Sequence, residues 1–282
     1  SPKRRLLKGA CSTQTHVMMP KFELPPVIET VLGVEFEALE RFGIAHFGLF
    51  WSRVRSVFPR CAIQPPLVSS IETFDQPITR PQLRLELADQ PEVRCWFHHT
   101  DGQRLIQVQR DRFIHNWQKT GDSVYPSYER IKPGFETNWN LFRAFLQDET
   151  LGEPRVLQCE VTYINRIEMP SGQASPLDLP KIFPLWSGEF SDSFLPAPER
   201  AQLGASFLMP NNQGRLHVNV QPAVRISDLK EVLQLTLTAR GAPSSSDTAS
   251  VLQWFDLGHE WVVKGFVSFT SSEMHKAWGR VQ

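Results

Sequence analysis

The chain has 282 residues, of which 41% are hydrophobic, so it is long enough to bury a full core. Its 30 Lys and Arg residues balance its 30 Asp and Glu residues, which excludes a global field that would recruit nucleic acid or an acidic membrane. We expect a soluble globular protein, because no apolar run approaches the roughly 20 residues that a transmembrane helix needs.

The four cysteines are scattered along the chain, with no CxxC pair and no secretory leader ahead of them. This pattern predicts reduced thiols in a cytoplasmic protein. The first eighteen residues are basic, polar and aperiodic, so we expect residues 1–18 to form a disordered extension. The 8 Trp and 19 Phe far outnumber the 3 Tyr, and such side chains bury large areas in cores or at interfaces.

The first half of the chain predicts strands interrupted by two helices. The run ETVLGVEFEAL places Leu32, Val34 and Phe36 on one face of a half-buried strand. Apolar residues at helical spacing between 41 and 58 predict a helix that Pro59 closes. We then expect a connection or an edge excursion over 61–81, strands over 83–88, 93–99 and 104–114, and a helix over 133–147 with Pro133 in its first turn.

The dipeptide Asp101-Gly102 separates two of these strands and predicts a β-hairpin. Both positions of a tight two-residue turn need positive φ, which Gly accepts freely and Asp tolerates. We therefore expect a two-residue turn at this point.

The second half predicts a similar series. The run RVLQCEVTYINRIEM predicts a long strand, and residues 170–198 have a loop-like composition. The runs LGASFLM, RLHVNVQ and EVLQLTLTAR then predict three more strands. A long helix follows with Asp247 as its cap, and the Thr-x-x-Glu pattern from Thr270 to Glu273 predicts a capping box that starts a separate short helix.

Each half thus predicts one long strand, a variable insertion, three successive strands and a helix with an apolar stripe. Strand runs followed by a helix favour antiparallel sheets covered on one face. We therefore predict the α+β class, with two pseudo-repeated lobes that each contain an antiparallel sheet and a covering helix. The predicted lobes span residues 19–150 and 151–282.

The densest polar constellation follows the predicted hairpin. On an extended run Arg110 and Arg112 point the same way, so two guanidinium groups would present one face suited to carboxylates or phosphates. The alternative is a solvated sheet face on which Asp111 and Asp122 balance the arginine charges, with Trp117 in the core. The candidate site for a ligand or partner comprises Arg110, Arg112, His115, Asn116, Trp117 and Tyr125.

No motif assigns a catalytic centre or a cofactor. The adjacent His98 and His99 point to opposite sides of a strand and cannot jointly ligate one metal ion. The sequence contains no Gly-x-Ser-x-Gly elbow, no GxxxxGK[ST] loop and no GxGxxG motif. We predict no catalytic residues, no metal and no cofactor, while an arrangement assembled only by folding stays open.

Several short motifs between Met19 and the end of the chain carry a family resemblance, among them Pro25-Pro26-Val27-Ile28-Glu29, Gln109, Arg112-Phe113, Asn116-Trp117, Tyr125-Pro126, Tyr163-Ile164-Asn165 and His259. Through them the chain resembles a sporadically distributed, functionally uncharacterised family of bacterial proteins of similar length. That family offers no catalytic residues to carry over. Its patchy distribution is similar to that of accessory genes, including toxin-antitoxin and phage-defence cargo.

A looser resemblance connects the ending from Val251 to Trp278 with the export-chaperone fold, in which four antiparallel strands precede a long and then a short helix. Two such units in one chain would resemble a dimer of them. The resemblance implies apolar grooves that hold unfolded or partner segments.

The leading interpretation is a non-enzymatic cytosolic accessory protein that binds another protein or a peptide, in the defence-associated setting that the resemblance implies. The alternative is an enzyme or sensor that binds a phosphorylated small molecule, a nucleotide or nucleic acid through the Arg cluster. We predict no membrane partner, and a homodimer stays open.

Overall fold

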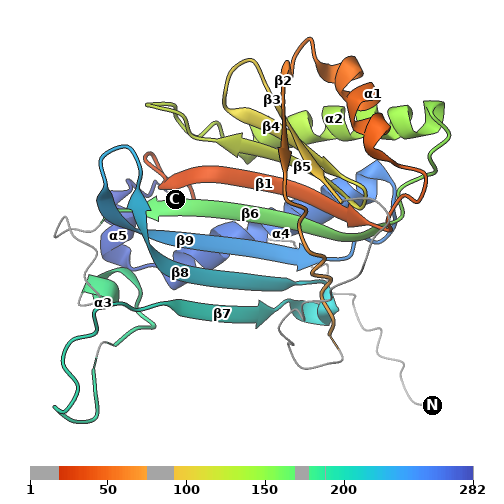
Figure 1. Ribbon diagram of the computed structural model, residues 1–282. Helices are drawn as coiled ribbons and strands as arrows, with labels where there is room; N and C mark the ends of the chain where they lie inside the picture. The colour runs from red at the N-terminus through yellow and green to blue at the C-terminus, as the bar shows by residue number, and fades with distance from the viewer. Residues whose placement is uncertain (1–18, 75–91, 169–177, 188, 282) are drawn as a thin grey trace, which may run out of the picture.

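The computed structural model describes residues 19–74, 92–168, 178–187 and 189–281, and its strands form one nine-stranded antiparallel sheet in the order β2-β3-β4-β5-β1-β6-β9-β8-β7 (Figure 1). The strands are β1 (Val27–Phe36), β2 (Arg60–Gln64), β3 (Arg94–His98), β4 (Arg104–Gln109), β5 (Arg112–Gln118), β6 (Val156–Ile167), β7 (Leu203–Leu208), β8 (Arg215–Arg225) and β9 (Lys230–Gly241). The helices are α1 (Ile44–Val54), α2 (Tyr128–Asp148), α3 (Leu179–Ile182), α4 (Thr248–Phe269) and α5 (Ser272–Ala277), with a 3₁₀ turn η2 (Pro210–Asn212). The predicted α+β class with an antiparallel sheet is confirmed.

The long helices cover one face of the sheet, and α2 and α4 lie behind the strands in Figure 1. Strand β1 presents Leu32, Val34 and Phe36 to this face, as the alternation of the sequence predicts. Helix α2 packs an aromatic stripe against this face. The rings of Phe113 on β5 and Phe142 on α2 stack with centroids 5.2 Å apart. We call this side of the sheet the helix-covered face. No helix in the described part of the chain is both long and apolar enough to cross a membrane.

A different element crosses the opposite face of the sheet. Residues 65–74 leave the end of β2 and run across the strands in front of β1, β6, β9 and β8 (Figure 1). We call this segment the strap and the face beneath it the strap face. The predicted connection or edge excursion over 61–81 is therefore the edge strand β2 followed by the strap, as far as the described residues extend.

The C-terminal helices follow the prediction, except at one cap. The Asp247 carboxylate accepts a hydrogen bond from a backbone N–H of the first turn at 2.9 Å and caps α4. Helix α5 begins after Ser271, whose hydroxyl accepts from the Met274 N–H at 3.3 Å. The predicted capping box at Thr270 is wrong, because Thr270 ends α4 and its hydroxyl donates to the Phe266 carbonyl.

Helix α2 starts earlier than its sequence predicts. It begins at Tyr128, so Pro133 lies inside the helix rather than in its first turn, and the missing N–H removes one hydrogen bond. Tyr128 and Ile131 are both buried, and the burial of these large side chains offsets that loss. The predicted strand over 83–88 lies outside the described residues.

The single strand predicted over 104–114 is wrong, because the structure has two strands there. Strand β4 ends at Gln109 and β5 begins at Arg112, and Arg110-Asp111 form a two-residue turn between them. The Arg110 carbonyl oxygen accepts a hydrogen bond of 3.0 Å from the N–H of Leu39, which follows β1. The Asp111 carbonyl oxygen accepts one of 2.9 Å from the N–H of Phe36, the last residue of β1. These long-range bonds stabilise a turn that no local pattern in the sequence reveals.

The hairpin at Asp101-Gly102 is confirmed, although its turn is wider than predicted. The His99 N–H donates to the Arg104 carbonyl at 2.9 Å, which leaves four residues in the loop, and Gly102 has a φ of +70°. The Asp101 carboxylate accepts from the N–H groups of Gln103 and Arg104 at 2.8 and 3.0 Å. These side-chain bonds stabilise the longer loop.

The substitution Gly102→Val is expected to lower the free energy of unfolding by about 1–2 kcal/mol, because a β-branched residue resists positive φ. A Cβ at Gly102 meets no atom within 4 Å, so the cost comes from the backbone alone. Gly204→Val on β7 is the matched control, since that site is equally open and has no positive φ. Urea unfolding of both variants measures the difference, and equal stabilities would contradict the role given to the turn.

Candidate functional site

The structure does not bring Arg110 and Arg112 together. Arg110 lies in the β4–β5 turn, where its exposed guanidinium lies 3.4 Å from the Glu92 carboxylate. Arg112 lies on β5 and is 8% exposed, and it forms an ion pair of 2.7 Å with the equally buried Glu35. The predicted shared guanidinium face is wrong, because Arg110 lies in the turn before β5 and the side-chain alternation that would align it with Arg112 does not extend to it.

Asn116 lies on the strap face in a buried polar network. Its amide nitrogen donates to the Glu29 carboxylate at 2.6 Å, and its oxygen accepts from Gln107 at 2.8 Å. The Gln107 oxygen in turn accepts from Arg94 and from the Trp96 indole, both at 2.9 Å. Burial raises the pKa of Glu29. Side chains from four neighbouring strands thus hold Asn116 in one orientation.

His115 and Trp117 point the other way, to the helix-covered face. His115 packs against Gly134 of α2, and burial lowers its pKa to about 3, so the imidazole is neutral. The Trp117 indole donates to the Gln103 side chain at 3.1 Å, and its ring makes an edge contact with Tyr125 at 5.5 Å between centroids. The six predicted residues are therefore divided among a turn and two opposite faces of the sheet.

Two glutamines on the strap face bind the backbone of the strap. The Gln109 side chain accepts from the Leu67 N–H at 2.8 Å and donates to the Leu67 carbonyl at 3.0 Å. The Gln158 side chain accepts from the Glu72 N–H at 2.8 Å and donates to the Ser70 carbonyl at 3.0 Å. Each amide thus pairs with a donor and an acceptor of one extended chain, whatever that chain's side chains are.

Charged groups hold the end of the strap. Glu72 forms ion pairs with Arg215 and His217 of β8, and the His217 Nε2 lies 2.5 Å from the carboxylate. Arg215 also donates to the Thr73 carbonyl at 3.3 Å, and its guanidinium lies 5.3 Å from the Phe74 ring centroid. The pKa of Glu72 is lowered, because the bonds and charges of His217 and Arg215 outweigh burial, which acts to raise it. This corner of the strap face is a carboxylate-binding site.

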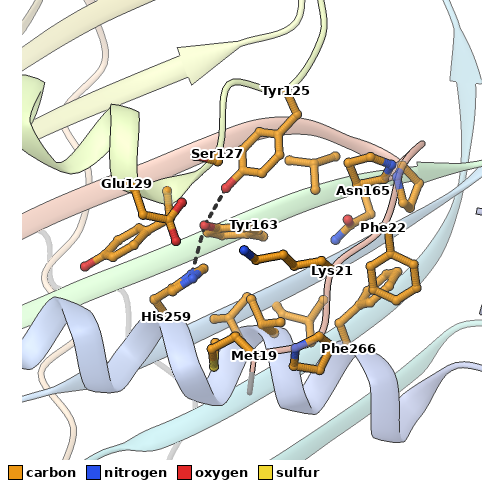
Figure 2. Close-up of a pocket in the computed structure, with 18 of the residues that line it drawn as sticks. Met19, Lys21, Phe22, Tyr125, Ser127, Glu129, Tyr163, Asn165, His259 and Phe266 are labelled. Atoms are coloured by element: carbon orange, nitrogen blue, oxygen red, sulfur yellow. Dashed lines mark hydrogen bonds between the residues drawn. The ribbon is translucent and has the colours of Figure 1, made fainter. Parts of the chain in front are cut away.

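A pocket of about 320 Å³ lies on the helix-covered face, between the N-terminal segment, the start of α2, β6 and α4 (Figure 2). The chain has only three tyrosines, and Tyr125, Tyr128 and Tyr163 all line this pocket. The hydroxyls of Tyr125 and Tyr163 lie 2.7 Å apart, and the Tyr163 hydroxyl lies 3.0 Å from the His259 Nδ1. Of the predicted site residues, Tyr125 belongs to this pocket.

The ionisable groups of this pocket are mostly neutral. Burial lowers the pKa of His259 to about 4 and raises the pKa values of Tyr125 and Tyr163. The His259 ring stacks on Tyr128 with centroids 4.0 Å apart, and the Tyr128 hydroxyl donates to Asp256 at 2.8 Å. The phenols are therefore hydrogen-bonding groups at neutral pH rather than nucleophiles.

Sequence reasoning missed Gln158, Arg215 and His217 on the strap face, and Tyr163 and His259 as members of a pocket. The one available signal for the pocket was the scarcity of tyrosine. The chain has three tyrosines, and they are divided between its two halves. Nothing local marks Gln158 or Arg215, whose partners are about 86 and 143 positions away.

Among the described residues, no group of three His, Cys, Asp or Glu side chains could hold a metal ion. Comparisons with protein-family models, with curated proteins and with solved structures return no match. The family resemblance therefore rests on the residues of the sequence alone.

Proposed function

We propose that the strap face binds an extended segment of a protein partner, and that the strap occupies this site until the partner displaces it. The observation that carries the proposal is the paired hydrogen bonding of Gln109 and Gln158 to the strap backbone. Such pairing recognises an extended main chain in any sequence. The Arg215 and His217 site adds selectivity for a segment with a carboxylate in the position of Glu72.

The contacts of the strap suit a displaceable occupant. The strap joins no strand ladder, because it crosses the strands and is held by their side chains. Each neutral hydrogen bond contributes only about 0.5–1.5 kcal/mol net, and the buried pair of Glu72 with Arg215 is one that a partner carboxylate has to replace. A cavity of about 190 Å³ remains between the strap and the sheet, lined by Arg112, Gln158 and Arg240 among others, so the strap does not fill its site.

A peptide supplied in trans tests this proposal. In the test variant a Gly-Ser linker replaces residues 66–73, and the ligand is a labelled peptide of residues 65–74, PPLVSSIETF. Fluorescence anisotropy should show saturable binding to this variant and at least about tenfold weaker binding to the intact chain, because a tethered segment competes at an effective concentration on the order of millimolar. A peptide with Glu72→Gln should bind the variant about tenfold more weakly.

Arg215→Met in the linker variant should weaken peptide binding about tenfold as well. Arg225→Met on the same strand is the matched control, because Arg225 pairs with Glu168 and Asp228 and contacts no strap residue. A folded linker variant that leaves the peptide unbound would show that the strap is only structural. Co-purification of genomic-neighbour proteins with the linker variant then addresses the defence-associated role that the resemblance implies.

We also infer that the two halves of the chain are pseudo-repeated lobes that share this one sheet. The strand order supports the inference, because β1-β5-β4-β3 on one side of the centre corresponds to β6-β9-β8-β7 on the other. In chain order, the last strand of the first half is β5 and that of the second half is β9. Each is followed by a long helix, α2 after β5 and α4 after β9. The proposed lobes of residues 19–150 and 151–282 meet between α2 and β6.

A further inference from the structure

The tyrosine-lined pocket lies on the helix-covered face and is separate from the strap. Its apolar half is formed by side chains such as Phe22, Leu237, Val262 and Phe266. Its volume of about 320 Å³ is at the lower end of the roughly 300–1,000 Å³ of ligand pockets. This size suits one small molecule rather than a peptide, with an apolar body against these side chains.

The polar half of the pocket offers hydrogen bonds that can change direction. Tyr125, Tyr163 and His259 form one chain of contacts of 2.7 and 3.0 Å. Each hydroxyl can donate or accept, and the neutral imidazole can carry its proton on either nitrogen. With the proton on Nδ1, all three groups donate in sequence and the Tyr125 hydroxyl donates to a ligand. The direction of this series of hydrogen bonds can therefore reverse to suit a ligand oxygen without the movement of a heavy atom.

Two opposite charges face this polar half without forming a pair. The Lys21 side chain extends over the pocket toward Tyr163, and the Glu129 carboxylate lies on the other side of that tyrosine (Figure 2). Among the described residues, no ion pair includes Lys21 or Glu129. Glu129 has a lowered pKa, first because the Ser127 side chain bonds to it and also because the Lys21 ammonium is nearby. The Lys21 ammonium and the Glu129 carboxylate therefore remain available to a ligand, while Glu23, which also lines the pocket, lies beside Gly279.

We infer that this pocket binds a free apolar α-amino acid. The ligand carboxylate accepts from the Lys21 ammonium and the Tyr125 hydroxyl, and the ligand ammonium donates to Glu129. The ligand side chain lies against Phe22 and Phe266. A zwitterion pairs with both charges, whereas a plain carboxylate leaves Glu129 without a partner and a plain amine leaves Lys21 without one.

Three ligands with the same aromatic body test the inference by isothermal titration calorimetry on the full chain. L-phenylalanine should bind at least about tenfold more tightly than 3-phenylpropionate, which lacks the ammonium, and than phenethylamine, which lacks the carboxylate. Lys21→Met and Glu129→Gln should each weaken L-phenylalanine binding about tenfold. Both residues are on the surface side of the pocket, so the variants should keep the wild-type melting temperature.

Glu136→Gln is the matched control, because it removes an exposed carboxylate from the same helix as Glu129 and Glu136 does not line this pocket. It should bind L-phenylalanine as the wild type does. Equal affinity for L-phenylalanine and 3-phenylpropionate would overturn the inference in favour of a simple carboxylate site. Absence of binding by all three ligands would overturn it entirely. Neither result bears on the strap, which lies on the opposite face of the sheet.

Discussion

Replacing Arg112 by methionine is expected to lower the free energy of unfolding by about 3–5 kcal/mol, because the change leaves the Glu35 carboxylate buried without its counter-charge. Glu35 is 6% exposed, and its remaining described partners are the hydroxyl of Ser69 on the strap and the charge of Arg240, which pairs with Glu160. The Arg112 guanidinium also donates to the Val68 carbonyl at 3.4 Å, so the variant loosens the strap as well. Urea unfolding at pH 7 measures the loss.

Arg110→Met is the matched control, since Arg110 is the other half of the predicted cluster but has an exposed side chain with a single surface partner. This substitution should change the free energy of unfolding by no more than about 0.5 kcal/mol. The double substitution Glu35→Gln with Arg112→Met should recover a large part of the lost stability, because no buried charge is then left alone. If both arginines cost the same, the assignment of Arg112 to a buried ion pair is wrong.

Lowering the pH from 7 to 5 is expected to destabilise the fold by about 4 kcal/mol through two histidines. Burial lowers the pKa of His115 to about 3 and of His259 to about 4 in the folded protein, against 6.5 for an ordinary histidine. In this window the unfolded chain binds protons that the folded chain does not, so stability is present above pH 6.5 and is lost as the pH falls. Each histidine contributes about 2 kcal/mol of the loss at pH 5.

The double variant His115→Asn with His259→Asn provides the comparison. Chemical unfolding at several pH values between 7 and 5 should show a flatter stability profile for this variant than for the wild type, with a residual slope from His98, His99 and His275, whose pKa values burial also lowers. The carboxylates with lowered pKa values, such as Glu72 and Asp101, affect stability mainly below this window. An equally steep profile in both proteins would mean that other groups cause the acid sensitivity.

Local sequence patterns predicted most of the secondary structure. The alternation through Leu32, Val34 and Phe36 identified β1 and the face that it buries, and Asp247 identified the start of α4. These signals are local, because side chains alternate along a strand and an N-cap bonds within its own first turn. The turn at Arg110-Asp111 was missed, because its stabilising bonds come from residues that end or follow β1.

The sequence by itself determined the fold class and the apolar face of each long strand and helix, because period and capping depend on neighbouring residues. Only the tertiary structure decided the composition of the sites. One position of alternation separates Asn116 on the strap face from His115 and Trp117 behind it. The strap face draws Gln109, Gln158 and Arg215 from three strands, and the pocket draws its tyrosines from both halves of the chain, through contacts that sequence spacing does not encode.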